Sequence, residues 1–481
     1  MAETAVPKIT PTLSAGELVD LSRPHFVGIG GAGMLPAARV CAERGFTVSG
    51  SDVRRTEGLK ALADLGVHVL HGHGAGQVPA GATAVVFTHA VGEDNAEVRE
   101  AQRRGIPLVH RSAALNTLMV GRTALGVLGT HGKSSTAGML AFAMSRMGLD
   151  PSYVVGGDFD GPTSGGHVGE GAFFVAEVDE SDRTHVEVSV DVALITNIAY
   201  DHVENYSGET DLVDAYEACV RGMRPGGTVV LNVDSPGCRE LASRLVMAGD
   251  GPRMVTYGMS SAADWRLTQA SSAGGHSTAV LCGPGGLEFE LAMRVPGVHQ
   301  LVNAAGAVAA LHVLNQECDV AVEQLRYFEG VHRRMSLAGE GAGVLVLDSF
   351  AHHPEEVSAD LAAAHTLVDG ESRVLAVFQP SDQVRLDAFG TEFAKALAGC
   401  AQVVVTGNAR SVREESLREL SETIDQAGGL ASVVMAGADA VMQVAGAARP
   451  GDVAVLIGTG DLVECGPLLT AMLTELEAAA A

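Results

Sequence analysis

The chain has 481 residues, of which 47% are hydrophobic and only 4% are aromatic. This length and composition suit roughly two to four α/β domains, in which small side chains let helices pack closely on sheets. The formal net charge is −26. No basic surface of the kind that duplex nucleic acid requires is visible in the sequence, so we expect no nucleic-acid partner.

The pattern of cysteines and the lack of long apolar runs in the sequence bear on the cellular compartment of the protein. The 7 cysteines are scattered and form no Cys-x-x-Cys pair, a pattern typical of reduced cytosolic thiols. The N-terminal stretch lacks a basic start followed by an apolar run, and no run of about 18 apolar residues occurs. We therefore expect a cytoplasmic protein with no membrane partner.

A glycine-rich turn marks the start of the chain, between an apolar strand and a helix that we expect to end near Glu43. Three glycines fit the pattern G-x-G-x-x-G: Gly28, Gly30 and Gly33. A second predicted strand, over residues 46–52, ends in Asp52, nineteen residues after the last of these glycines. This is the dinucleotide fingerprint, in which the acid binds a ribose hydroxyl. Taken alone, the fingerprint favours an NAD-dependent enzyme.

A second glycine-rich turn carries Gly-Thr-His-Gly-Lys-Ser at residues 129–134, between a predicted buried strand and a predicted helix. This arrangement cradles phosphates, because backbone N–H groups and the helix N-terminus face the anion. Lys133 adds a mobile charge, and the Ser134 hydroxyl can bind Mg²⁺. The stricter form of the pattern would have glycine in place of Val127. The alternative is an ordinary glycine-rich turn with a surface lysine.

Acidic and histidine side chains follow two further buried strands. One strand runs to Glu177, and a strand over residues 192–198 leads to His202. Because parallel strands deliver ligands at their carboxyl ends, we expect both side chains to converge on the loop that holds Ser134. A carboxylate, a histidine and a hydroxyl can hold Mg²⁺ when phosphate oxygens and water complete the octahedron, although His202 could instead hold a water. The acids at residues 179–182 include at least one that we expect in a solvated loop.

The last third of the chain again alternates strands and helices. A strand over residues 344–348 ends in Asp348 and is followed by His352, His353 and a helix to about Leu367. Further strands are predicted at 374–378, 403–406 and 452–457. Earlier in the chain, the Gly/Ser-rich stretch 271–276 is expected to be a loop.

These elements predict an α/β fold of three domains. Residues 1–120 form an N-terminal Rossmann-like domain. Residues 121–335 form a central, P-loop ATPase-type mononucleotide-binding domain. Residues 336–481 form a C-terminal Rossmann-like domain.

Taken together, these motifs resemble the Mur ligases, which add amino acids to the UDP-linked peptidoglycan precursor. The resemblance extends from about His25 to Asp461. The matching stretches are 28–34, 129–134, 177–182, 196–198 with 201–202, 296–297 with His299 and Asn303, 328–334, and 348–354. In that family the first glycine turn cradles a UDP-sugar rather than NAD. The resemblance implies that the muramyl carboxylate attacks the γ-phosphorus of ATP, and that an amino group then attacks the resulting acyl phosphate.

The resemblance also assigns roles to individual residues. It implies that the UDP-sugar is bound by Gly28, Gly30, Gly31, Gly33, Asp52 and His73. It implies that ATP is bound by Gly129, Thr130, His131, Gly132, Lys133, Ser134, Ser135, Asn303, Arg334 and Asp348. Mg²⁺ would be held by Ser134, Glu177 and His202, and the catalytic set would be Lys133, Glu177, His202, His352 and Arg385. For each histidine, a structural role such as helix capping stays open.

Departures from the family concern the substrate regions. After Phe-Gln-Pro the alanine-adding members carry His, often Arg, an aromatic and then a second Arg, whereas this chain has Ser381 and Asp382 and keeps only Arg385, a candidate clamp for the amino acid's carboxylate. Ser349 and Phe350 replace an acid and a tyrosine, and Thr88-His89 replaces a Ser-Ser pair near the expected uridine site.

The sequence leaves several readings open. The first is a ligase that joins an amino acid, L-alanine by default, to the UDP-linked muramyl carboxylate. The second is a relative that uses the same ATP chemistry on another carboxylate or amine in a specialised pathway. An NAD-dependent oxidoreductase and a non-catalytic nucleotide-binding regulator are the alternatives from other classes. The expected partners are small-molecule substrates. We expect the chain to be a monomer or a homodimer.

Overall fold

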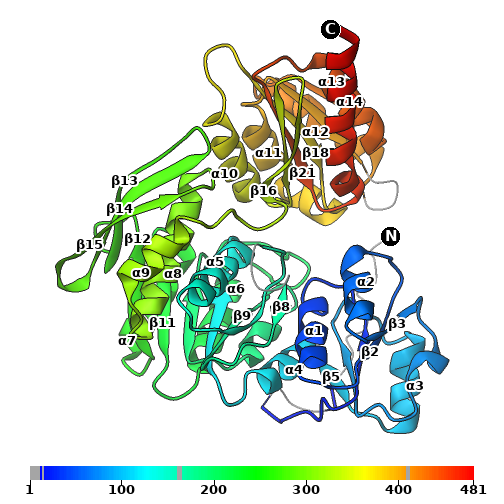
Figure 1. Cartoon of the computed structure of the whole chain (residues 1–481), viewed down its shortest axis with the longest axis vertical. Helices are drawn as coiled ribbons and strands as arrows, with labels where there is room; N and C mark the ends of the chain where they lie inside the picture. The colour runs from blue at the N-terminus through cyan, green and yellow to red at the C-terminus, as the bar shows by residue number, and fades with distance from the viewer. Residues whose placement is uncertain (1–10, 13–15, 160–164, 408–411, 481) are drawn as a thin grey trace. The chain divides into compact units, whose positions relative to one another are not determined.

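The computed structural model describes residues 11–12, 16–159, 165–407 and 412–480. Contacts divide the chain into two compact units. Figure 1 labels helices and strands of both. Unit 1 comprises Met1–Ala199, Glu209–Tyr257 and Gly306–Gln324. Unit 2 comprises Tyr200–Gly208, Gly258–Ala305 and Leu325–Ala481. The start of the predicted first domain, residues 1–10 and 13–15, lies outside the described residues.

Unit 1 begins with a five-stranded parallel sheet in the order β3-β2-β1-β4-β5. Its strands are β1 (Pro24–Val27), β2 (Ser49–Asp52), β3 (His68–His71), β4 (Ala84–Phe87) and β5 (Leu108–His110). Its helices are α1 (Leu35–Glu43), α2 (Glu57–Asp64), α3 (Ala96–Arg104) and α4 (Arg111–Leu118), with the 3₁₀ turn η1 (Ala75–Gln77). The strand order reverses at β1, so the first glycine turn lies at the topological switch point, where α/β sheets bind ligands.

The second sheet has the order β15-β14-β13-β12-β11-β10-β6-β9-β7-β8, and its strands from β12 to β8 belong to unit 1. These strands are β6 (Thr123–Leu128), β7 (Ser152–Val154), β8 (Gly166–His167), β9 (Phe173–Glu177), β10 (Val192–Ile195), β11 (Thr228–Asn232) and β12 (Arg253–Gly258). The accompanying helices are α5 (Lys133–Arg146), α6 (Glu209–Arg221), α7 (Pro236–Ala248) and α9 (Cys318–Leu325), with η2 (Thr184–Glu187). Strand β6 pairs in parallel with β9 on one side and β10 on the other. The order therefore reverses again at the strand that enters the second glycine turn.

Unit 2 contains an antiparallel ribbon and a third sheet. The ribbon is formed by β13 (Trp265–Ala273), β14 (His276–Gly283) and β15 (Leu287–Met293), with η3 (Pro284–Gly286). The expectation of a loop over 271–276 is therefore wrong, because Ser271 to Ala273 pair with His276 to Thr278 and only two glycines form the turn. Helix α8 (Val298–Val313) runs along the chain from unit 2 into unit 1.

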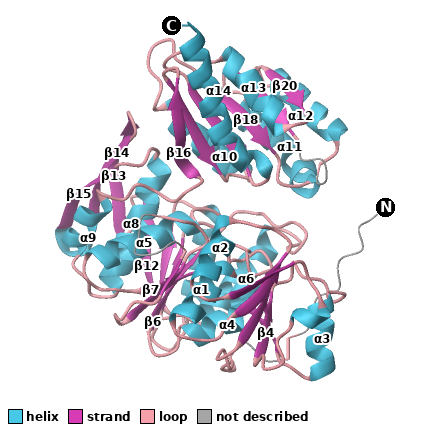
Figure 2. Ribbon diagram, turned by 45° about the vertical axis from the view of Figure 1, so that its right-hand side comes forward, coloured by secondary structure: helices cyan, strands magenta, loops and turns pink. Residues whose placement is uncertain are grey.

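The third sheet has the order β16-β17-β21-β18-β19-β20. Its strands are β16 (Arg334–Gly341), β17 (Val344–Ser349), β18 (Val374–Gln379), β19 (Gln402–Thr406), β20 (Ala431–Val434) and β21 (Val453–Gly458). Its helices are α10 (Pro354–His365), α11 (Gln383–Leu397), α12 (Glu414–Gln426), α13 (Gly437–Ala447) and α14 (Cys465–Ala480), with η4 (Asp461–Glu464). One apolar cluster joins α10, α11 and α12 to one face of the sheet, and a second joins α13 and α14 to the other (Figure 2). A strand that is covered on both faces has a continuous run of apolar residues in its sequence. Such runs allow these strands to be predicted from the sequence.

The predicted α/β fold is confirmed, and the described residues form three sheets. The boundaries at residues 120 and 335 stay predictions. Among the residues that the structure describes, no helix has the length and apolar character needed to cross a lipid bilayer.

Candidate functional site

The phosphate loop lies between β6 and α5, as the sequence predicts. Helix α5 begins at Lys133, and Gly132 precedes it in the left-handed conformation with φ of 78°. Gly129 has φ of 126°, and a Cβ there would collide with the Thr196 hydroxyl. Both positions therefore require glycine.

Side chains from the end of β10 hold this loop in place. The backbone N–H of His131 donates to Asn197 Oδ1 over 2.9 Å, and Asn197 Nδ2 donates back to the His131 carbonyl over 2.9 Å. The Thr130 hydroxyl donates to the carbonyl of Ala199, over 3.0 Å. These contacts fix the loop backbone and engage the N–H groups of Thr130 and His131, so the N–H groups that the loop can hold in place for an anion are those at the start of α5.

The side chain of Lys133 is largely buried, with 13% of its surface exposed. Its ammonium group donates to the carbonyls of Gly129 (2.6 Å) and Thr130 (3.1 Å) and lies 2.8 Å from Glu180 Oε2. Burial alone would lower the pKa of Lys133, but the charges of Glu180 and Asp179 outweigh it and raise the pKa above its ordinary value. Lys133 is thus a cation held at the loop by a buried carboxylate.

Ser134 and Glu177 lie together at the start of α5. The Ser134 hydroxyl donates to Glu177 Oε1 over 2.9 Å, and the Gly156 N–H donates to Glu177 Oε2 over 2.6 Å. Glu177 ends β9 and pairs in register with Val127 of β6, so the parallel sheet itself brings the two groups together. Glu177 therefore reaches the loop at Ser134, as the sequence predicts, because of the order of the strands.

The acids that follow β9 are bound by cations of this chain, and Glu180 and Asp182 are nearly buried, whereas Asp179 keeps 34% of its side chain exposed. The expectation of a solvated acid therefore stays a prediction, for Asp179. Arg111 Nη2 lies 2.7 Å from Asp179 Oδ2 and 3.2 Å from Asp182 Oδ2. Burial would raise the pKa of Asp179, but Arg111 and Lys133 hold it well below its ordinary value. Gly33 lacks a Cβ at the place where Arg111 passes, so the first glycine turn also leaves room for this guanidinium.

Two histidines complete the surroundings of Asp182. His89 Nδ1 lies 3.5 Å and His110 Nε2 3.2 Å from Asp182 Oδ2. The two imidazole rings stack, with their centroids 4.7 Å apart. Burial lowers the pKa of His110. His89, which departs from the family pattern, therefore faces the acidic loop within unit 1.

In the first glycine turn, Asp52 binds the protein's own backbone. Its Oδ2 accepts from the Gly30 N–H over 2.9 Å, and its Oδ1 accepts from the Arg54 N–H over 2.8 Å. Gly28 has φ of 76°, which favours glycine. His73 follows β3, and its Nδ1 lies 2.8 Å from the Ser51 hydroxyl. The predicted UDP-sugar residues thus gather at the carboxyl ends of β1, β2 and β3.

In unit 2, Arg385 is bound between two carboxylates. Its Nε lies 2.9 Å from Asp201 Oδ1 and its Nη2 3.1 Å from Asp201 Oδ2, while Nη1 donates to Asp382 Oδ2 over 2.9 Å. Nη2 is also 3.2 Å from His202 Nδ1. Burial would raise the pKa of Asp201, but Arg385 and His202 hold it well below its ordinary value. Arg385 therefore uses its Nε–H and one N–H of each outer nitrogen to bind carboxylates of the chain itself, which leaves fewer donors for a substrate carboxylate.

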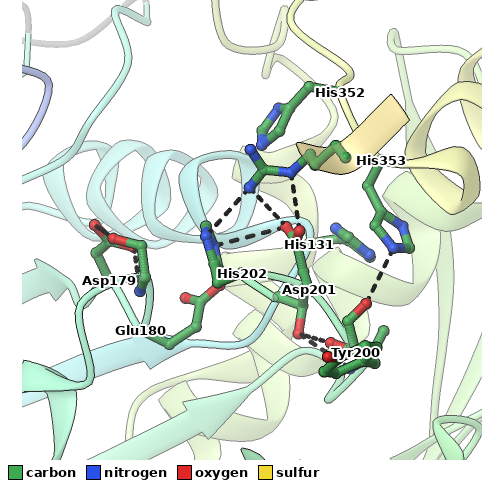
Figure 3. A network of polar contacts seen from close by, with 12 residues as sticks. His131, Asp179, Glu180, Tyr200, Asp201, His202, His352 and His353 are labelled. Atoms are coloured by element: carbon green, nitrogen blue, oxygen red, sulfur yellow. Dashed lines mark hydrogen bonds and ion pairs between the residues drawn. The ribbon is translucent and has the colours of Figure 1, made fainter. Parts of the chain in front are cut away.

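The two histidines before α10 differ in role. His353 caps the helix, since its Nδ1 accepts from the Glu355 N–H over 3.3 Å, and its Nε2 lies 3.3 Å from the Tyr200 carbonyl (Figure 3). His353 thus has the structural role, helix capping, that the sequence allows for each histidine. His352 Nδ1 lies 3.0 Å from the Phe350 carbonyl, and burial lowers the pKa of His352.

The remaining predicted nucleotide residues also lie in unit 2. Asp348 pairs with Arg333, whose Nε is 3.2 Å from Asp348 Oδ2. The Arg334 guanidinium carbon lies 5.0 Å from the centre of the Phe350 ring. Asn303 lies on α8 and is buried.

Within unit 1, the structure brings together Lys133, Ser134 and Glu177. Within unit 2 it brings together His202 and Arg385. Since these sets belong to different units, His202 as a third metal ligand beside Ser134 stays a prediction. Sequence reasoning missed Glu180 as the partner of Lys133 and Asn197 as the brace of the loop, although both lie in stretches that it singled out.

A phosphate loop at a sheet switch point, with a buried lysine and a hydroxyl–carboxylate pair, defines a P-loop nucleotide-binding enzyme. Three family models match the chain: "Mur ligase family, catalytic domain" over residues 23–123, "Mur ligase middle domain" over 127–311, and "Mur ligase, glutamate ligase domain" over 333–460. The chain belongs to the Mur ligase family, whose members are ATP-dependent ligases.

Individual relatives match along nearly the full length. The chain is 41% identical over 452 residues to a UDP-N-acetylmuramate–L-alanine ligase of Streptomyces avermitilis, with 93% of this chain and 96% of the relative covered. It is 40% identical over 471 residues to the protein of that name from Mycobacterium sp. (strain JLS), with 94% and 96% covered. Among solved structures, UDP-N-acetylmuramate-alanine ligase MurC from Thermotoga maritima matches with a TM-score of 0.79 and 28% identity, covering 95% of this chain and 100% of that one.

Proposed function

We propose that the chain joins L-alanine to the carboxylate of UDP-N-acetylmuramate in an ATP-dependent reaction that forms an amide bond. The observation that carries this proposal is the identity of about 40% over nearly the full chain with ligases of that name. The phosphate loop with Lys133 and the Ser134–Glu177 pair supports the ATP half of the reaction.

The donor set at the loop suits Mg²⁺. A serine hydroxyl and a carboxylate 2.9 Å apart are hard oxygen ligands, and Mg²⁺ takes such ligands together with phosphate oxygens and water. Ser134 and Glu177 would hold the ion, with His202 as the third protein group. When bound, Mg²⁺ would offset the negative charge of the phosphates.

The residues of the chain have separate tasks in this proposal. The braced loop backbone and Lys133 bind the phosphates and offset the charge that develops when the muramyl carboxylate attacks the γ-phosphorus. The glycine turn after β1 positions the UDP-sugar, as does His73. Asn303, Arg334 and Asp348 would bind the nucleotide, while His352 and Arg385 would position substrates.

One observation favours the second candidate, a relative that uses the same ATP chemistry on a different amine or carboxylate. Asp382 stands where alanine-adding members often carry arginine, and it binds Arg385 over 2.9 Å. A carboxylate at this position changes the charge that the incoming amino acid meets.

The experiment is phosphate release from ATP and Mg²⁺ with UDP-N-acetylmuramate across twenty amino acids. Release with L-alanine and a product of the matching mass is expected. Release with a different amino acid would favour the second candidate and place the change near Asp382. ATP binding without substrate-dependent release would favour a regulator, and a rise in nicotinamide fluorescence on titration would favour an oxidoreductase.

The expected partners, compartment and oligomeric state are those that the sequence predicts. The partners are the UDP-sugar, the amino acid and ATP. The chain would act in the cytoplasm as a monomer or homodimer.

A further inference from the structure

Two histidines and an aspartate of unit 1 direct three ligand atoms toward one another. His89 follows β4, His110 ends β5, and Asp182 lies in the loop after β9. His110 Nε2 lies 3.2 Å and His89 Nδ1 3.5 Å from Asp182 Oδ2. All three atoms lie within 4.8 Å of one another. Two imidazole nitrogens and one carboxylate oxygen are ligands that divalent transition metals accept.

Hydrogen bonds do not account for this arrangement. The two histidine nitrogens are shielded from solvent, and among the residues that the structure describes neither has a hydrogen-bond partner. The side chain of His110 is only 2% exposed, and that of Asp182 is 10% exposed. A buried polar nitrogen without a partner costs free energy. An ion between the three atoms would give each nitrogen a partner.

The distances suit a tetrahedral ion. Zn²⁺ binds imidazole nitrogen and carboxylate oxygen at about 2.0–2.2 Å, so the ligand atoms of a tetrahedral site are about 3.3–3.6 Å apart. The two distances to Asp182 Oδ2, 3.2 and 3.5 Å, are close to this range. The side chain of His89 is 19% exposed, so its ring has room to turn toward His110, and a water molecule can complete the coordination.

Further contacts orient two of the three ligands, as is usual in metal sites. Asp182 Oδ1 accepts from the Thr184 N–H over 3.2 Å, which leaves Oδ2 to face the histidines. A neutral histidine that binds an ion through Nε2 has its proton on Nδ1, and His110 Nδ1 lies 2.9 Å from the Ser112 hydroxyl. The Ser112 oxygen can accept from Nδ1, because its own proton is donated to Glu187 Oε2 over 3.0 Å. Without an ion, His110 Nδ1 can instead accept from the Ser112 N–H, 3.3 Å away, and cap α4.

The neighbouring arginine is compatible with an ion at this place. Arg111 Nη2 lies 3.2 Å from Asp182 Oδ2 but only 2.7 Å from Asp179 Oδ2. Arg111 therefore keeps its closer carboxylate when an ion binds Asp182. Because the two carboxylates outnumber the single guanidinium, the group keeps a net negative charge that attracts a cation.

We infer that His89, His110 and Asp182 form a binding site for a divalent transition-metal ion of the class of Zn²⁺. The site shares no ligand with the Ser134–Glu177 pair, and its nitrogen ligands do not suit Mg²⁺, which takes oxygen ligands. His89 stands where the family pattern has serine, so the site belongs to this chain rather than to the family. The ligands follow strands of the first and second sheets, so an ion bound to them links the two sheets and stabilises unit 1.

The first measurement is a titration of the full chain with Zn²⁺, in excess Mg²⁺ and without nucleotide, so that Mg²⁺ occupies the oxygen sites. Wild type should bind one Zn²⁺ tightly. His89→Ser, which restores the residue of the family pattern, should lower the affinity about 100-fold or more, since losing an outer contact of a metal site already costs about 10- to 100-fold. His68→Ser makes the same substitution at an exposed histidine on β3 and should bind Zn²⁺ as wild type does.

The second measurement uses Co²⁺ as a coloured substitute for Zn²⁺. A tetrahedral Co²⁺ ion with nitrogen and oxygen ligands absorbs visible light much more strongly than hydrated Co²⁺. Wild type and His68→Ser should show this absorption, and His89→Ser should not. Zn²⁺ should also raise the unfolding temperature of wild type and His68→Ser but not of His89→Ser, because an ion that binds only the folded chain stabilises it.

Three outcomes would overturn the inference. Equal Zn²⁺ affinity in wild type and a folded His89→Ser variant would mean that the ion binds elsewhere. An affinity that falls equally in His89→Ser and His68→Ser would mean that scattered surface histidines bind the ion. If His89→Ser does not fold, wild type decides alone, and a Co²⁺ spectrum identical to that of the hydrated ion would rule out the site.

Discussion

The ammonium of Lys133 lies 2.8 Å from the carboxylate of Glu180, and Glu180 is almost completely buried. The loop lysine is therefore one half of a buried ion pair as well as a phosphate ligand. Removing one member of a buried pair leaves an uncompensated charge, which costs more than the pair itself is worth. A substitution at Lys133 should consequently change both the free energy of unfolding and the activity.

Lys133→Ala should abolish phosphate release and also lower the free energy of unfolding by about 3–5 kcal/mol, because Glu180 is left without its cation. The double variant Lys133→Met, Glu180→Gln should regain most of that stability and stay inactive. Phosphate release and denaturant unfolding of both variants give the measurement. Near-normal turnover in a folded double variant would remove Lys133 from the phosphate site.

Ser134→Ala should raise the Mg²⁺ concentration needed for half-maximal phosphate release roughly tenfold or more, since one ligand and the contact to Glu177 are lost. Glu177 stays held by the Gly156 N–H, so the fold should persist. Ser145→Ala is a control on the same helix, because the Ser145 hydroxyl donates to the Ala141 carbonyl, one turn back on α5, over 2.7 Å. An unchanged Mg²⁺ requirement in Ser134→Ala would mean that the ion is held elsewhere.

Local patterns predicted much of this fold. The strand, glycine loop and helix around Lys133 lie within one short stretch, where apolar runs and glycines determine the structure. The meeting of Ser134 with Glu177 also follows from sequence, because parallel strands bring their carboxyl ends to one edge. Strand β3, with the sequence His-Val-Leu-His, was not predicted because its polar residues hide the apolar pattern.

Contacts between residues far apart in the chain could not be predicted from the sequence. Arg111 and Asp179 are 68 positions apart, and nothing near either residue indicates the other. The run around Asp179 has the composition of a solvated loop, and only its distant cations make it part of a network of ion pairs. In the same way, composition predicts a loop at Ser271, whereas pairing with Thr278 makes it part of a hairpin.

Arg385→Ala should raise the KM for the amino acid roughly ten- to a hundredfold, the effect of losing one charged hydrogen bond of about 1.5–3 kcal/mol. Asp382→Asn is the informative companion, because it releases Nη1 of Arg385 from its bond to Asp382. This variant should lower the KM for the amino acid. If Arg385→Ala instead lowers kcat with an unchanged KM, Arg385 acts by bracing Asp201 and His202.

Asp360 makes the stability of unit 2 depend on pH. Burial raises the pKa of this carboxyl from 3.8 to about 7, and Glu356 adds to the rise against the hydrogen bond from Ser349. Between these two values the folded chain holds a proton that the unfolded chain has lost. The contribution of Asp360 to stability therefore falls as the pH rises from about 4 to about 7 and is constant above that range.

Asp360→Asn removes this titration and keeps a side chain that can bond to Ser349. The difference in free energy of unfolding, wild type minus Asp360→Asn, should thus be larger at about pH 5 than at about pH 8. Denaturant unfolding of both proteins at the two pH values measures it, and taking the difference cancels the titration of groups such as Asp201, whose lowered pKa has the opposite effect. A difference that is the same at both pH values would mean that Asp360 is ionised in the folded chain throughout, with a cation close enough to offset its burial.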